Sequence, residues 1–138
     1  MTPLKDVKFL KLEKLNLGFN NISDISIFQK VNFIELKELN LCPNLISDIS
    51  VLTKVKFNKI EILNLSKNKI KDINALENTD FKELKKLYLS DNFISDFHIL
   101  KRVKLKKLEA LEIYNNKINE DERKFIMSIS NFKNIIFI

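Results

Sequence analysis

The residue types best suited to chemistry near neutral pH are scarce in this sequence of 138 residues. It holds one cysteine, Cys42, in the stretch LCPN, and one histidine, His98. A catalytic thiolate needs a neighbouring base or cation, and a histidine-based metal site or general base needs further ligands or partners. Because neither residue type occurs twice, the sequence predicts no metal site and no catalytic constellation built on them.

The glycine content excludes another group of enzymes. With a single glycine, the chain has no glycine-rich phosphate loop, and it has no nucleophile elbow of the type G-x-S-x-G. We therefore predict a protein that is not an enzyme and uses no cofactor. Tight turns must then be made without glycine, and we expect asparagine to make them because it tolerates left-handed backbone angles.

Asparagine is also the polar residue with the most regular spacing. Its amide offers a donor and an acceptor, so it can satisfy the backbone N–H and C=O groups left unpaired where a chain leaves a sheet. We predict a structural role, not a catalytic one, for an asparagine ladder that recurs every 24 residues: Asn20, Asn44, Asn68, Asn92 and Asn116.

This spacing belongs to a repeat that organises the whole chain. Segments such as LEKLNLGFNNISDI and LKELNLCPNLISDI align without a gap when they start at residues 12, 36, 60, 84 and 108. A partial copy covers residues 1–11, and a partial terminal strand covers 132–138. In-register copies of one short unit indicate stacked repeats, so we predict one domain over residues 1–138.

The motif L-x-x-L-x-L-x-x-N-x-I resembles the leucine-rich repeat, and its continuation is similar to the intracellular phosphatase-regulator and internalin type. The resemblance implies an α/β solenoid, a right-handed superhelix with a parallel sheet on the concave face. Short helices or 3₁₀ turns would form the convex face. Asp24, Asp48, Asp72 and Asp96 directly precede these turns and are expected to cap their first N–H groups.

Alternation within each copy predicts which strand residues face the core. Leucines two places apart, such as Leu63 and Leu65, share one face of a strand and should point inward. At the last copy the pattern changes, and NEDERKFIMSI reads as an amphipathic helix with Phe125, Ile126 and Ile129 inward. We interpret this segment as a modified terminal unit.

The strand residues that face away from the core are the candidates for binding a partner. Ile62, Tyr88 and Tyr114 move two places along the strand for each strand crossed, which predicts an apolar diagonal on the concave face. The core needs none of them, and exposed aromatic residues at the centre of such a face commonly anchor protein partners. We therefore predict a protein-binding module whose concave face also displays Asn16, Asn40, Asn64 and Glu112, with Phe19 at its edge.

Two alternatives remain open at this stage. The basic segment 101–107, with Lys101, Arg102 and Lys104 among its residues, could bind nucleic acid or acidic lipid, although a net charge of +6 does not establish this. The chain could also be a purely structural segment of a longer array. Its last strand, NIIFI, offers an apolar edge that could associate with a second copy.

Cysteine use and the N-terminal sequence bear on location. One cysteine cannot form an internal disulfide, and MTPLKDVKF lacks the apolar core of a signal peptide. No apolar run reaches the roughly 20 residues of a membrane span. These features predict an intracellular protein, in the cytoplasm or the nucleus.

Overall fold

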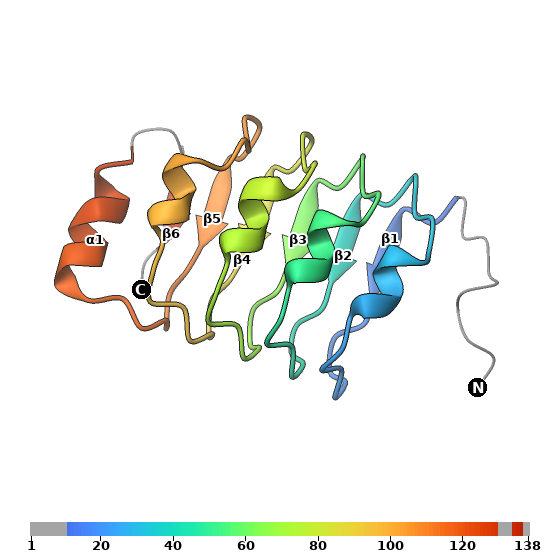
Figure 1. Ribbon diagram of the computed structural model, residues 1–138, viewed down its shortest axis with the longest axis horizontal. Helices are drawn as coiled ribbons and strands as arrows, with labels where there is room; N and C mark the ends of the chain where they lie inside the picture. Colours follow the sequence, from blue (N-terminus) through green and yellow to red (C-terminus); the bar gives the residue numbers. More distant parts are fainter. Residues whose placement is uncertain (1–10, 130–133, 137–138) are drawn as a thin grey trace.

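The computed structural model describes residues 11–129 and 134–136, which form a solenoid with one strand in each turn (Figure 1). The six strands make a single parallel sheet in the order β1-β2-β3-β4-β5-β6. A 3₁₀ turn follows each of the first four strands, and an α-helix follows the fifth. The elements are β1 (Lys14–Asn16), η2 (Ser26–Gln29), β2 (Glu38–Asn40), η3 (Ser50–Thr53), β3 (Ile62–Asn64), η4 (Asn74–Asn78), β4 (Lys86–Tyr88), η5 (His98–Lys101), β5 (Ala110–Glu112), α1 (Glu120–Met127) and β6 (Asn134–Ile136).

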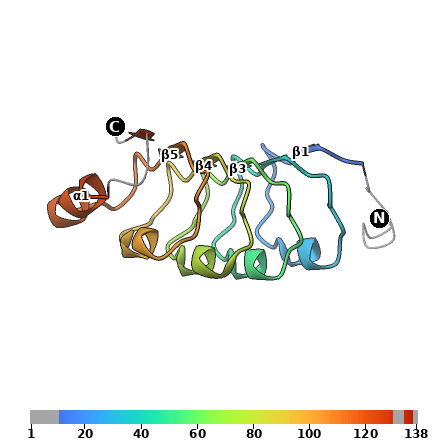
Figure 2. The ribbon, with the colours of Figure 1, turned by 90° about the horizontal axis from the view of Figure 1, so that it is seen from above.

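The register of the sheet follows the repeat. Leu15 pairs with Leu39, which pairs with Leu63, so each strand residue lies beside its equivalent in the next copy. Figure 2 shows the strands along one side of the molecule and the 3₁₀ turns along the other. This arrangement confirms the predicted α/β solenoid. The partial copy predicted for 1–11 lies outside the described residues apart from residue 11, and only 134–136 of the terminal strand are described.

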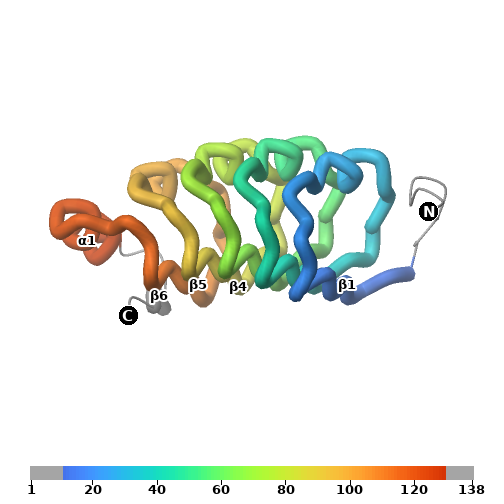
Figure 3. Tube along the Cα trace, turned by 90° about the horizontal axis from the view of Figure 1, so that it is seen from below, coloured from blue at the N-terminus to red at the C-terminus, as the bar shows by residue number. Residues whose placement is uncertain are grey.

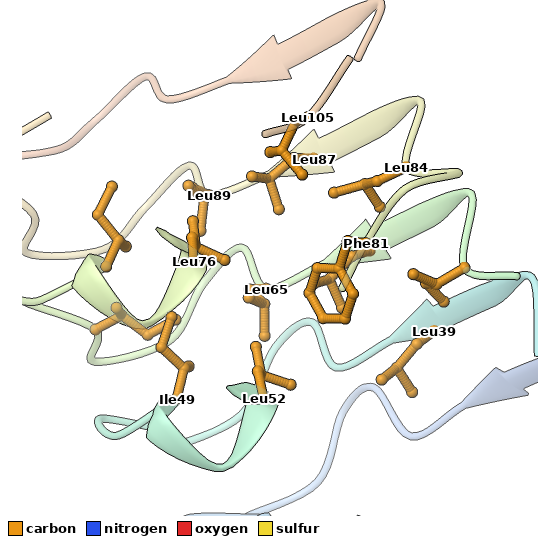
Figure 4. Packing of buried hydrophobic residues seen from close by; sticks show 14 of the residues in the cluster. Leu39, Ile49, Leu52, Leu65, Leu76, Phe81, Leu84, Leu87, Leu89 and Leu105 are labelled. Carbon is orange, nitrogen blue, oxygen red and sulfur yellow. The ribbon is translucent and has the colours of Figure 1, made fainter. Parts of the chain in front are cut away.

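The core fills the space between the sheet and the 3₁₀ turns (Figure 4). Leu63 and Leu65 are fully buried, as the alternation predicts. Opposite them, Leu52 and Leu76 project inward from η3 and η4. A column of aromatic rings completes the layer, with the ring centroids of Phe33 and Phe57 6.1 Å apart. Each copy buries its apolar face against its neighbours, so the turns of the solenoid stabilise one another.

The turns are made differently from the expectation. The residues with positive φ occupy position eight of their copies, one place before the ladder asparagine: Phe19 (58°), Lys67 (52°), Asp91 (55°) and Asn115 (51°). The prediction that asparagine makes these turns is therefore wrong in three of the four cases. The second copy has Pro43 at this position, preceded by a cis peptide bond.

The single glycine, Gly18, does not adopt the positive φ of a tight turn and instead allows a close backbone contact. A Cβ at Gly18 would lie 2.1 Å from the backbone oxygen of Cys42 in the next copy. Real Cβ atoms do not approach an oxygen so closely, so only glycine fits at this position without moving the backbone. Gly18 thus permits close stacking of the first two copies.

Helix α1 closes the last described turn of the solenoid, as predicted, and lies at the end of the row of 3₁₀ turns (Figure 3). The side chain of Asn119 caps it by accepting a hydrogen bond from the Glu122 N–H at 2.8 Å. Ile126 and Ile129 are buried and Phe125 is half-buried, in agreement with the predicted inward side. Glu122 is also buried, which the sequence pattern did not indicate.

Candidate functional site

Four asparagines of the ladder make hydrogen bonds that join neighbouring copies: Asn44, Asn68, Asn92 and Asn116. The Nδ2 group of Asn68 donates to the carbonyls of Leu65 and Ser66 in its own copy and of Leu41 in the preceding one. Its Oδ1 accepts from the Ile46 N–H at 2.9 Å. Asn68 is only 5% exposed, so its amide is not available to a ligand. Asn44, Asn92 and Asn116 make the same kinds of bonds.

The concave face carries a hollow of about 370 Å³ over strands β1 to β4. Ile62 and Tyr88 are both part of its lining and are half-buried. An ion pair of 2.7 Å between Lys14 Nζ and Glu38 Oε1 lies at its β1–β2 end. The hydrogen bond and charge of Glu38 raise the pKa of Lys14, so Lys14 keeps its charge at neutral pH. The hollow therefore combines an apolar end with a neutralised charged end.

A row of three asparagines crosses the same hollow: Asn16, Asn40 and Asn64. Each uses its Oδ1 locally, because it accepts the backbone N–H two residues further along the chain at 2.9–3.0 Å. Within the described part of the chain, their Nδ2 groups have no hydrogen-bond partner. Adjacent strands lie about 4.8 Å apart, so the row presents amide donors at that spacing.

The remaining predicted residues lie beyond the hollow. Glu112 lies on β5 and Tyr114 in the loop after it, and both are half-buried. Phe19 is 89% exposed at the edge where the sheet meets its loops. The same edge carries exposed Leu45 and Phe93, and the Lys117 ammonium lies 5.3 Å from the centroid of the Phe93 ring. The structure therefore groups Ile62 and Tyr88 with the asparagines and leaves Tyr114, Glu112 and Phe19 outside this group.

Two further hollows, of about 230 Å³ and 510 Å³, lie on the convex side. One lies between η2 and η3 and the other between η3 and η4, and Asp48, Ser50 and Lys54 line both. Because successive copies produce equivalent grooves here, these hollows follow from the spacing of the 3₁₀ turns. The concave hollow, in contrast, depends on side chains that differ between copies.

Cys42 shows no sign of activation. It is half-buried at the sheet-to-loop edge, and burial raises the pKa of its thiol, outweighing the opposite effect of Lys67. A raised pKa keeps the sulfur protonated and poorly nucleophilic at neutral pH.

The basic segment 101–107 is largely occupied by contacts within the protein. Arg102 Nε lies 3.1 Å from Glu77 Oε1, and Lys107 Nζ lies 2.6 Å from Glu83 Oε2. Lys101 is 4.8 Å from the centroid of the Phe125 ring. Among the described residues, only Lys104 and Lys106 of the segment's five basic side chains lack such a contact. This pairing reduces the charge that the segment can offer to phosphate groups.

One cluster was missed by the sequence reasoning. His98 Nδ1 lies 3.1 Å from Asp96 Oδ1 and 3.3 Å from Glu122 Oε2. The sequence analysis did not place these two carboxylates beside His98. Asp96 comes from the same turn as His98, while Glu122 comes from α1, outside the repeat pattern. The sequence pattern contains no signal for this contact, because it did not indicate that Glu122 is buried.

Stacked parallel strands, 3₁₀ turns and a buried asparagine ladder define this chain as a repeat solenoid. A family model described as Leucine rich repeat matches residues 34–94, and a second one of the same description matches residues 11–31. The chain belongs to the leucine-rich-repeat family, and its repeats are of the internalin-like type. No curated protein sequence matches the chain.

Solved structures of similar fold include bacterial leucine-rich-repeat proteins. An internalin (inlF) from Listeria monocytogenes has 26% identity and a TM-score of 0.67, with 90% of this chain and 41% of that one covered. Internalin C2 from the same species has 23% identity and a TM-score of 0.69, with 100% and 66% covered. A leucine-rich-repeat protein from Leptospira interrogans has 24% identity and a TM-score of 0.65, with 97% and 38% covered. The chain thus spans less than half the length of the inlF and Leptospira proteins and about two thirds of the length of internalin C2.

Within residues 11–129 and 134–136, no helix has the length and apolar character needed to cross a membrane. The cytoplasmic location stays a prediction.

Proposed function

We propose that this chain is a non-catalytic protein-binding module that holds its partner on the concave face, over strands β1 to β4. Leucine-rich-repeat solenoids commonly serve as interaction modules because their stacked strands offer a broad continuous surface. The observation that carries the proposal is the hollow of about 370 Å³, where Ile62 and Tyr88 lie beside the asparagine row.

The chemistry of this hollow suits a protein surface. Ile62 and Tyr88 supply an apolar anchor point, since both side chains lie outside the core cluster and only half-buried. The Nδ2 groups of Asn16, Asn40 and Asn64 have no hydrogen-bond partner among the described residues and can donate to carbonyl or carboxylate oxygens of a partner. A central aromatic anchor surrounded by hydrogen-bonding groups is the usual arrangement of a protein-binding hot spot.

The absence of a catalytic site is part of the proposal. Cys42 has a raised pKa, and the hollow contains no histidine or cysteine. The lining of the hollow includes one acidic residue, Glu38, which is paired with Lys14. Recognition of a neutral, mixed polar and apolar surface accounts for these side chains better than acid–base or nucleophilic chemistry does.

Affinity capture with three forms of the full chain tests the proposal. The wild type identifies the bound protein, the double variant Ile62→Ala/Tyr88→Ala removes the apolar anchor, and Gln29→Ala/Lys54→Ala is the matched control on the convex side. We expect the first double variant to lose the partner and the control to retain it, with unchanged thermal transitions in both. A partner that is captured equally well by all three forms would contradict the proposed face.

A further inference from the structure

The cluster at the end of the solenoid carries a further inference, independent of the proposed binding face. We propose that Asp96, His98 and Glu122 form a site for one divalent transition-metal ion of the zinc class, which ties helix α1 to the turn η5. The three side chains offer one imidazole nitrogen and two carboxylate oxygens. These ligand atoms all lie within 4.8 Å of one another.

The distances agree with tetrahedral coordination. His98 Nδ1 is 3.1 Å from Asp96 Oδ1 and 3.3 Å from Glu122 Oε2. Bond lengths of about 2.0–2.2 Å place the ligand atoms of a tetrahedral zinc ion roughly 3.3–3.6 Å apart. Two of the three spacings are therefore close to those that an ion requires. The two carboxylate oxygens, which lie within 4.8 Å of each other, need to approach by at most roughly 1.2–1.5 Å.

Each ligand is oriented by a second contact. Asp96 Oδ1 also accepts the His98 N–H at 2.8 Å, and the other oxygen of Glu122, Oε1, accepts the Phe97 N–H at 2.5 Å. The His98 ring stacks on Phe125 with a centroid distance of 3.9 Å and an interplanar angle of 17°. Hydrogen bonds and packing of this kind hold metal ligands in place before the ion binds.

The repeat itself does not require His98. The equivalent turn in the second copy has Asp48 and Ser50, whose backbone N–H donates to Asp48 Oδ1 at 2.7 Å. The third copy makes the same bond with Asp72 and Asn74. Serine and asparagine thus serve the turn equally well, and the fourth copy is the one where an imidazole meets a buried carboxylate from α1.

The donor set identifies the class of ion. Imidazole nitrogen with carboxylate oxygens suits zinc and neighbouring transition metals, whereas magnesium prefers oxygen ligands in octahedral geometry. The side chain of His98 is 60% exposed and that of Glu122 only 8%, so the solvent side of the site leaves a fourth position for water. Metal binding requires the Nδ1 atom of His98 without its proton, which is released to solvent.

Isothermal titration of the full-length chain, without a histidine tag, tests the site with zinc chloride as the probe and magnesium chloride as the comparison. We expect one zinc ion for each chain, a raised thermal midpoint that is reversed by EDTA, and magnesium binding at least ten times weaker. A cobalt(II) titration should give the visible absorption bands of tetrahedral coordination.

Two variants separate the site from surface binding elsewhere. His98→Ser restores the residue of the second copy and removes the nitrogen ligand, and Glu122→Gln keeps an oxygen acceptor for the Phe97 N–H while removing the charge. Both should weaken zinc binding at least about tenfold, with circular dichroism unchanged. The proposal is overturned if the wild type binds no zinc, if magnesium binds as tightly, or if His98→Ser binds zinc as well as the wild type.

Discussion

Ile46 and Asn68 lie on successive turns of the solenoid and are joined by a hydrogen bond of 2.9 Å from the Ile46 N–H to Asn68 Oδ1. The same amide donates to Leu41 in the first of these turns and to Leu65 in the second. One buried side chain therefore satisfies backbone groups of two copies at once. The ladder explains how loops without glycine can stack in register at the edge of the sheet.

The loss of stability on replacing a ladder asparagine should depend on whether the asparagine lies between two copies or at the exposed first turn. Asn68→Ala leaves buried donors and acceptors of two copies unpaired, and we expect the free energy of unfolding to fall by about 2–4 kcal/mol. Within the described residues, Asn20 bonds only to the carbonyls of Leu17 and Gly18 in its own exposed turn. Asn20→Ala should therefore cost about 1 kcal/mol or less. Urea denaturation measures both, and equal losses would contradict the ladder's role.

Gly18 and Ser90 occupy the same position of different copies, and only Gly18 should lose stability when it is replaced by alanine. Gly18→Ala places a Cβ against the Cys42 oxygen, and we expect a loss of about 1–3 kcal/mol in the free energy of unfolding. Ser90 is fully buried, and its Oγ has no hydrogen-bond partner among the described residues. Ser90→Ala should leave stability unchanged or raise it by up to about 1 kcal/mol. Thermal melts that show Gly18→Ala as stable as wild type would refute the close approach.

Acid should weaken the turns on the convex side. The pKa values of Asp24, Asp48 and Asp96 lie below their ordinary value of 3.8. The main cause is that each carboxylate accepts a hydrogen bond from the backbone N–H two residues further along the chain. A depressed pKa in the folded state stabilises the fold above pH 3.8, and this contribution is lost as pH falls through the folded-state pKa.

The variant Asp48→Asn isolates one of these contributions because its side-chain oxygen can still accept the Ser50 N–H. We expect the wild type to be the more stable protein near neutral pH and the difference in unfolding free energy to shrink between about pH 5 and about pH 2. Chemical denaturation at a series of pH values measures this difference. A gap that stays constant or widens in acid would show that the Asp48 charge does not contribute.

Residues governed by the repeat could be predicted from the sequence. Leu63 and Leu65 are buried because strand alternation fixes their direction, and Asn68 is fixed by the need to satisfy the backbone at the sheet edge. Ile126 is buried because helical spacing applies once the repeat ends. In each case a short-range period determines which side of the chain faces the core.

Three features could not be predicted because they depend on contacts between copies or elements. The ladder holds Asn68 in position nine, so the left-handed conformation falls on Lys67 before it, against the intrinsic preference of lysine. Glu122 and His98 meet because α1 packs on η5, and no period in the sequence relates them. The hollow on the concave face likewise required three-dimensional neighbours, although its members Ile62 and Tyr88 were identified as outward-facing.

The affinity of the captured partner for wild-type and variant chains is the most direct test of the proposed binding face. We expect Ile62→Ala/Tyr88→Ala to raise the dissociation constant at least about 30-fold, the effect of losing one hot-spot side chain of about 2 kcal/mol. Gln29→Ala/Lys54→Ala should change it less than about threefold, since surface residues outside a hot spot contribute little. Tight binding by the concave-face variant, together with weak binding by the convex-face control, would place the partner on the opposite side and contradict the account.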